Sequence, residues 1–114
     1  GVADQPQALA LAEPIARALD GQLSGDGGAV RVALSFKDGD GRYCRGFAAT
    51  NLSGIACREA GSWQLRYAAP TPTQQTDYRQ AGTDAARAAV IAAMIDGEPL
   101  DRGGEAAARK AGWR

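Results

Sequence analysis

Histidine is absent from this chain of 114 residues, and cysteine occurs only twice. Histidine is the commonest general base of enzymes and the commonest metal ligand, so both kinds of site are excluded in their usual form. Two cysteines without histidine cannot build an ordinary zinc site by themselves. We therefore expect neither a metal nor a cofactor in this protein.

The chain also lacks net charge, because 13 lysines and arginines are balanced by 13 aspartates and glutamates. A generic nucleic-acid or anionic-membrane binder normally carries a strong basic excess, so we expect no direct contact with nucleic acid. No run of about 18 apolar residues occurs, which predicts that no segment spans a membrane. Gly1 is not an initiator methionine and no signal peptide follows it. We expect a mature form or a fragment, with any targeting or membrane segment upstream.

Large apolar side chains are scarce as well. Aromatic residues make up 6% of the chain, and 25 of its apolar residues are alanine. The length predicts a single domain, residues 1–114, with one core. That core must depend on a few large side chains, while alanine allows close helix packing.

Apolar periodicity predicts the order of the elements. A four-residue repeat favours a helix over residues 8–23, with its firm part from Pro14 to Leu23. Alternation of apolar and polar residues then predicts a sheet over residues 30–68. Its four expected strands are residues 30–36, 42–50, 55–59 and 63–68. Because the turns between them are short, the strands should form an antiparallel meander.

The C-terminal part is predicted to be helical after a proline-rich linker at residues 69–76. A helix over residues 83–96 would begin at Thr83, and a helix over residues 101–111 would be capped by Asp101. The last helix is rich in alanine and glycine, so it should depend on the docking of Trp113. The predicted fold is therefore α+β, with an N-terminal helix, the four-stranded meander, and two C-terminal helices packed on one sheet face.

The two cysteines, Cys44 and Cys57, lie on the second and third predicted strands. A hairpin centred on residues 50–52 places them nearly opposite each other, where Cβ atoms are about 4.5–5.5 Å apart and close to disulfide reach. A disulfide there would close a loop of about 14 residues and stabilise the fold by roughly 3 kcal/mol. The alternative is two buried free thiols in a cytosolic domain. A disulfide would imply an oxidising compartment such as the periplasm.

Strand alternation then assigns side chains to the two faces of the sheet. If both cysteines point inward, a set of arginines and aromatic residues points outward. This candidate partner-binding face consists of Arg31, Tyr43, Arg45, Phe47, Arg58 and Arg66.

Three interpretations of that face remain open. It is a solvated face whose arginines pair with Asp38, Asp40 and Glu59, or a face covered by a protein partner, a second copy or another part of this chain, or a site for an anion or nucleic acid. Aromatic residues beside arginine are typical of interfaces.

No group of residues has the pattern of an active site. The serines have no histidine to activate them, and Gly39-Asp40-Gly41 is not followed by a P-loop lysine or by EF-hand spacing. Cys44 and Cys57 lack the C-x-x-C spacing of redox catalysts. We therefore expect that the protein is not an enzyme.

The segment from Phe36 to Phe47, followed by Gly54–Arg58 and Gly61–Trp63, resembles a known family. It is similar to the C-terminal extracytoplasmic domain of transmembrane anti-sigma factors from alphaproteobacteria. The resemblance covers most of residues 15–114. Its further segments are Tyr78-Arg79, Ala93–Asp101, Glu105–Arg109 and Gly112-Trp113. A similar Tyr-Cys-Arg, Ala-Cys-Arg and Gly-x-Trp pattern also occurs in small surface-antigen lipoproteins of the cell envelope.

The family's sigma-binding part is an N-terminal cytoplasmic domain followed by a membrane helix, and this chain contains neither. The resemblance thus implies a periplasmic sensory domain that influences sigma-factor release, held at the inner membrane only through an upstream helix. It implies no catalytic residue, and it retains Cys44 and Cys57 as a structural pair. The alternative resemblance implies an envelope lipoprotein domain with a structural or binding role.

Overall fold

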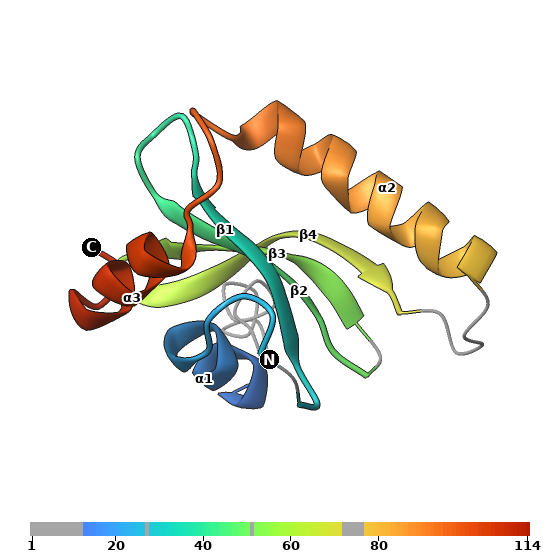
Figure 1. Ribbon diagram of the computed structural model, residues 1–114, viewed down its shortest axis with the longest axis horizontal. Coiled ribbons are helices and arrows are strands. Elements are labelled where there is room, and N and C mark those ends of the chain that lie inside the picture. Colours follow the sequence, from blue (N-terminus) through green and yellow to red (C-terminus); the bar gives the residue numbers. More distant parts are fainter. Residues whose placement is uncertain (1–12, 27, 51, 72–76) are drawn as a thin grey trace, which may run out of the picture.

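The structure, a computed structural model, describes residues 13–26, 28–50, 52–71 and 77–114. Four strands form one antiparallel sheet in the order β1-β2-β3-β4, with one helix before it and two after it (Figure 1). The elements are α1 (Glu13–Gly21), β1 (Arg31–Lys37), β2 (Tyr43–Ala48), β3 (Leu52–Glu59), β4 (Ser62–Pro70), α2 (Asp77–Met94) and α3 (Arg102–Lys110). The predicted α+β fold with a meander sheet is confirmed. None of the described helices is both long enough and apolar enough to cross a membrane.

The helix boundaries differ from the predicted ones mainly at α2. This helix begins at Asp77, so Thr83 lies inside it and is not its N-cap. It continues through Gly82 although glycine costs about 1 kcal/mol relative to alanine in a helix interior. Part of the predicted linker, Ala69 and Pro70, belongs to β4 instead. Residues 8–12 of the first predicted helix and residues 72–76 of the linker lie outside the described part of the chain.

The two C-terminal helices pack on opposite faces of the sheet, which corrects the expectation that they share one. Ile91 of α2 packs with Phe36 and both cysteines on the first face. Ala108 of α3 and Trp113 pack with α1 on the second face. Figure 1 shows α2 on one side of the sheet and α1 and α3 on the other.

The connection between α2 and α3 explains this arrangement, because it runs along the free edge of β1. The backbone amide of Asp96 donates to the carbonyl of Lys37 at 2.8 Å, and that of Leu100 donates to the carbonyl of Ser35 at 2.8 Å. These bonds satisfy carbonyl groups that an edge strand would otherwise leave open. The chain therefore passes from one face of the sheet to the other while it protects the edge.

A bulge in β1 gives both faces of the sheet apolar side chains. The pairing with β2 shifts between Val32 and Leu34, so that Ala33 is an extra residue. Val32 therefore packs on the face of α1 and α3, whereas Leu34 and Phe36 pack on the face of α2. The regular alternation of the sequence had placed all three on one face; the bulge shifts the parity by one residue.

Both ends of α3 are fixed by local hydrogen bonds. The Asp101 carboxylate accepts from the backbone amide of Gly104 at 2.7 Å, as predicted for an N-cap. At the other end, the amide of Trp113 donates to the carbonyl of Ala108 at 2.8 Å, and the amide of Gly112 donates to that of Arg109 at 3.0 Å. This pattern is a Schellman motif, which turns the chain back onto its helix. Trp113 is thereby directed into the core, where it is 3% exposed.

Candidate functional site

The predicted partner-binding face is largely inside the protein. Arg45 and Phe47 have no solvent exposure, and Tyr43 is half-buried. The predicted face was right, because the side chains of these residues lie on the face of the sheet that Cys44 does not share. Their expected exposure to solvent was wrong. Since α1 and α3 pack on this face, the interpretation that holds for it is coverage by another part of this chain.

Arg45 is the centre of this covered face. Its Nε donates to the Ser35 hydroxyl at 2.7 Å, and its Nη1 donates to the carbonyl of Leu19 at 2.6 Å. Its Nη2 lies 3.5 Å from the Glu105 carboxylate, a long contact that leaves this nitrogen without a well-formed hydrogen bond in the described structure. The guanidinium also lies 4.5 Å from the ring centroid of Trp113. One side chain on β2 thus contacts α1, β1, α3 and the C-terminal tryptophan.

Glu105 accepts hydrogen bonds from several donors. Its carboxylate accepts hydrogen bonds from the Ser24 amide at 2.9 Å, from the Ser35 hydroxyl at 2.7 Å and from the Ser24 hydroxyl. Burial alone would raise the pKa of Glu105, but the hydrogen bonds and the charge of Arg45 outweigh it. The pKa of Glu105 therefore lies below its usual value, and this buried side chain is ionised at neutral pH.

Burial has the opposite effect on the partner. It lowers the pKa of Arg45, and the charge and hydrogen bonding of Glu105 oppose that shift. An arginine nevertheless stays protonated in a protein. The two opposite charges thus lie together inside the protein and connect α3 to the sheet.

Asp20, near the end of α1, organises the rim of the same face. Its carboxylate accepts from Arg58 Nη1 at 2.9 Å and from Trp63 Nε1 at 2.8 Å, and its carbonyl accepts from Trp113 Nε1 at 3.1 Å. The Arg58 guanidinium lies 5.5 Å from the ring centroid of Trp63. Trp113 packs edge-on against the rings of Tyr43 and Trp63, with centroids 5.8 and 5.5 Å away. Arg58 is therefore a half-buried structural residue.

Arg31 and Arg66 do not belong to this face: a bulge displaces Arg31, and Arg66 follows Leu65, which itself lies on the covered face. Arg31 precedes the bulge of β1 and pairs with Ala48, which places it on the face of Cys44 and α2. Arg66 is the extra residue of a second bulge, and it forms an ion pair with Glu59. The six predicted residues therefore do not form one surface. Four share the covered face and two lie elsewhere.

The predicted disulfide is present. Cys44 and Cys57 are direct partners in the pairing of β2 with β3, and their sulfur atoms are bonded. Both residues have no solvent exposure and pack beneath Ile91 of α2. The bond thus staples the centre of the sheet on the face opposite Arg45.

Metal and catalytic sites find no support in the residues described. One group has ligand atoms near one another, namely Asp38 with Cys44 and Cys57, but the cysteines are bonded to each other and offer no thiolate. The Asp38 carboxylate is occupied by the amides of Asp40 and Arg42, both at 2.9 Å. Glu105 is the carboxylate with a shifted pKa, and it is closed off from any substrate.

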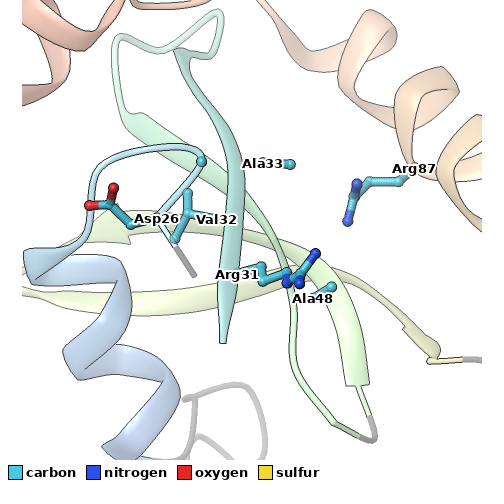
Figure 2. A pocket seen from close by; sticks show the side chains of 7 residues that line it. Asp26, Arg31, Val32, Ala33, Ala48 and Arg87 are labelled. Carbon is cyan, nitrogen blue, oxygen red and sulfur yellow. The ribbon is translucent and has the colours of Figure 1, made fainter. Parts of the chain in front are cut away.

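A hollow beside β1, open toward the face of α2, is large enough to hold a small ligand. It lies between β1 and α2, next to the loop that follows α1 (Figure 2). Two arginines, Arg31 and Arg87, line it together with small apolar residues. Of the predicted site residues, Arg31 alone lines this opening.

Sequence reasoning missed the partners of Arg45. Glu105, Ser35 and Ser24 had no assigned role, and Asp20 was not considered. One signal was present: Glu105 lies three residues before Ala108, on the side of α3 that is buried. A lone carboxylate on the buried side of a helix demands a cationic partner. The sequence did not reveal which arginine this is, because Arg45 is distant along the chain.

Comparisons with known proteins returned no relative. No family model matches this chain, and no curated protein and no solved structure matches it significantly.

Proposed function

We propose that this chain is the periplasmic sensory domain of a membrane-bound anti-sigma factor and that it works by binding. The observation that carries the proposal is the buried Cys44–Cys57 disulfide at the centre of the sheet. A disulfide of this kind persists in oxidising compartments and is rare in the cytosol. Glu105, the described carboxylate with a shifted pKa, is buried, which favours a binding role over a catalytic one.

The residues behind the resemblance support the same proposal, because they contact one another. Arg45 comes from the cysteine-containing segment, and Glu105 and Trp113 come from the C-terminal segments. Arg45 contacts both of them directly. The segments that carry the resemblance thus belong to one interaction network, which supports treating them together.

The same network suggests how a signal would travel. Arg45 holds the carbonyl of Leu19 in α1, and Glu105 holds the loop at Ser24. In the proposed protein the chain upstream of α1 leads to the membrane helix. A ligand or partner that moves α3 would therefore shift α1 through Arg45, because a buried charge cannot be left unpaired without cost.

The test uses the complete gene in its native cell. We expect an upstream cytoplasmic domain and a membrane helix, and we expect the two cysteines to resist a thiol-alkylating reagent until a reductant is added. Deletion of the region from α1 to the C-terminus should change transcription of the genes that depend on the cognate sigma factor. Free thiols in unreduced cells, or an upstream sequence without a membrane helix, would overturn the proposal.

The second candidate is an envelope lipoprotein domain with a structural or binding role. It is favoured by the Tyr-Cys-Arg, Ala-Cys-Arg and Gly-x-Trp pattern, whose residues lie on β2, β3 and β4 of one sheet. A lipidated cysteine after a signal peptide, detected by labelling with a fatty acid, would favour this candidate over the first.

A further inference from the structure

The hollow between β1 and α2 has the dimensions of a ligand site. Its volume is about 390 Å³, within the range typical of small-molecule pockets. It is lined by Gly25, Asp26, Arg31, Val32, Ala33, Ala48 and Arg87. Figure 2 shows these residues coming from three places: the loop after α1, the first two strands, and α2.

Small residues create the hollow. Ala33 is the extra residue of the β1 bulge, and Ala48 pairs with Arg31 on the face that α2 covers. Beside them, α2 packs over Gly46, where a Cβ atom would lie 3.5 Å from Ile91 and 3.6 Å from the Arg87 stem, in ordinary contact distance. The helix thus contacts the sheet at Gly46, while the two alanines leave space next to it.

Two guanidinium groups flank this space. The Arg31 side chain is exposed and makes no hydrogen bond or ion pair with the side chains and backbone that the structure describes. Arg87 Nη1 donates to the carbonyl of Phe47 at 3.1 Å, which holds its guanidinium over the end of β2. In Figure 2 the two side chains extend toward each other, Arg31 from the strand and Arg87 from the helix. Two cations facing one hollow attract an anion and repel each other without one.

The acidic residue of the hollow, Asp26, has partners outside it. The Asp26 carboxylate accepts from the backbone amide of Leu23 at 3.2 Å and lies 3.6 Å from the Arg102 guanidinium. Figure 2 shows it on the far side of β1, pointing away from both arginines. The part of the hollow nearest α2 is therefore lined by the two arginines and not by Asp26.

We propose that this hollow binds a small organic molecule that ends in a carboxylate or phosphate group. The two guanidinium groups would hold the oxyanion, since arginine matches the oxygens of both groups with parallel hydrogen bonds. The small side chains of Ala33 and Ala48 would accept a short carbon chain beside the oxyanion. The site differs from the covered face of Arg45, and it stands whether or not the domain belongs to an anti-sigma factor.

The test is a titration of the oxidised protein, followed by its two-dimensional amide NMR spectrum at low salt. The probes are succinate, glycerol 3-phosphate and inorganic phosphate, with neutral succinamide and glycerol as controls. We expect saturable shifts at the amides of Arg31, Ala33 and Ala48 with at least one anionic probe and none with the neutral ones. Stronger binding of succinate would identify a carboxylate site, and stronger binding of the phosphates a phosphate site.

Matched arginine variants decide whether the hollow is responsible. Arg31→Gln should weaken binding about tenfold, because it removes one charge-assisted contact and no described contact of the free protein. Arg87→Gln should weaken it as well. Arg66→Gln removes an equal charge from β4, away from the hollow, and should leave binding unchanged. Shifts that never saturate, or an equal loss in Arg66→Gln, would overturn the proposal.

Discussion

Arg45 on β2 and Glu105 on α3 form an ion pair with an N–O distance of 3.5 Å, and neither residue has any solvent exposure. Ser35 connects them, because its hydroxyl donates to Glu105 and accepts from Arg45. Each charge is thus tolerated only in the presence of the other. The position of α3, and with it the covered face of the sheet, depends on this relationship.

Glu105→Gln should destabilise the protein strongly. The substitution keeps the size of the side chain but leaves the Arg45 charge buried without its partner, and such a loss typically costs about 3–5 kcal/mol. Urea denaturation measures the effect as a drop in the free energy of unfolding. An exposed pair offers the comparison: Glu13→Gln breaks the Arg17–Glu13 contact on the surface of α1 and should cost less than about 1 kcal/mol.

The double variant Arg45→Met/Glu105→Leu tests whether the cost arises from the unpaired charge. Replacing both partners leaves no buried ion, so the double variant should be more stable than Glu105→Gln. Losses that simply add in a double-mutant cycle would contradict coupling between the two residues.

The stability of the protein should fall with acid, and Glu105 should contribute to that fall. Its pKa in the folded protein is depressed below the value of about 4.3 typical of an unfolded chain. The unfolded state therefore binds the proton first, so the contribution is complete above the unfolded pKa and is lost as pH falls through the folded pKa. Urea midpoints measured from neutral pH downward should drop more steeply for the natural protein than for Glu105→Gln. Parallel profiles would show that Glu105 is not the responsible group.

Removing the disulfide should cost roughly 3 kcal/mol, the value that chain entropy gives for a loop of about 14 residues. Cys44→Ala/Cys57→Ala should still fold, because Ile55 and Ile91 continue to pack around the site. Urea denaturation with and without reductant checks this. Reductant should shift the midpoint of the natural protein and leave the double variant unchanged. Two free thiols in the denatured, unreduced protein would contradict the bond itself.

Much of the sheet could be predicted from local sequence. The opposition of Cys44 and Cys57 followed from the position of the turn between their strands, and the alternation of β2 correctly separated Cys44 from Arg45. These features depend on residues close in the chain, where turn chemistry and side-chain parity act directly.

The burial of Arg45 could not be predicted in this way. It depends on α3, which reaches that face only because the chain crosses the edge of β1 beforehand. The bulges at Ala33 and Arg66 were hidden as well, since neither residue type marks a bulge. The bulge in β1 moves Arg31 off the predicted face, whereas Arg66 is off it because it alternates with Leu65, which lies on the covered face. The burial of the candidate site therefore depends on tertiary packing, whereas the strands could be predicted from the local sequence pattern.

In the turn between β3 and β4, Ala60 has a strained backbone conformation that a substitution could relieve. Ala60 has a φ of 53° and Gly61 a φ of 84°, between the paired residues Glu59 and Ser62. A two-residue hairpin of this kind favours Asn-Gly or Gly-Gly, because both central residues need positive φ. Alanine pays roughly 1 kcal/mol there, since its Cβ crowds the backbone in the left-handed region. Ala60→Gly should therefore raise the free energy of unfolding by about that amount, and Ala60→Asn should raise it as well.

Gly61→Ala is the control for Ala60→Gly, because it should change stability in the opposite direction. A Cβ at Gly61 would meet no atom within 4 Å, so the substitution tests backbone conformation without a steric clash. It should lower the free energy of unfolding by about 1 kcal/mol, because it places alanine in the same left-handed region. Both turn residues lie far from the Arg45 network, so the two effects should add to those of Glu105→Gln. If Ala60→Gly destabilised the protein, the positive φ of Ala60 would not be a source of strain that limits its stability.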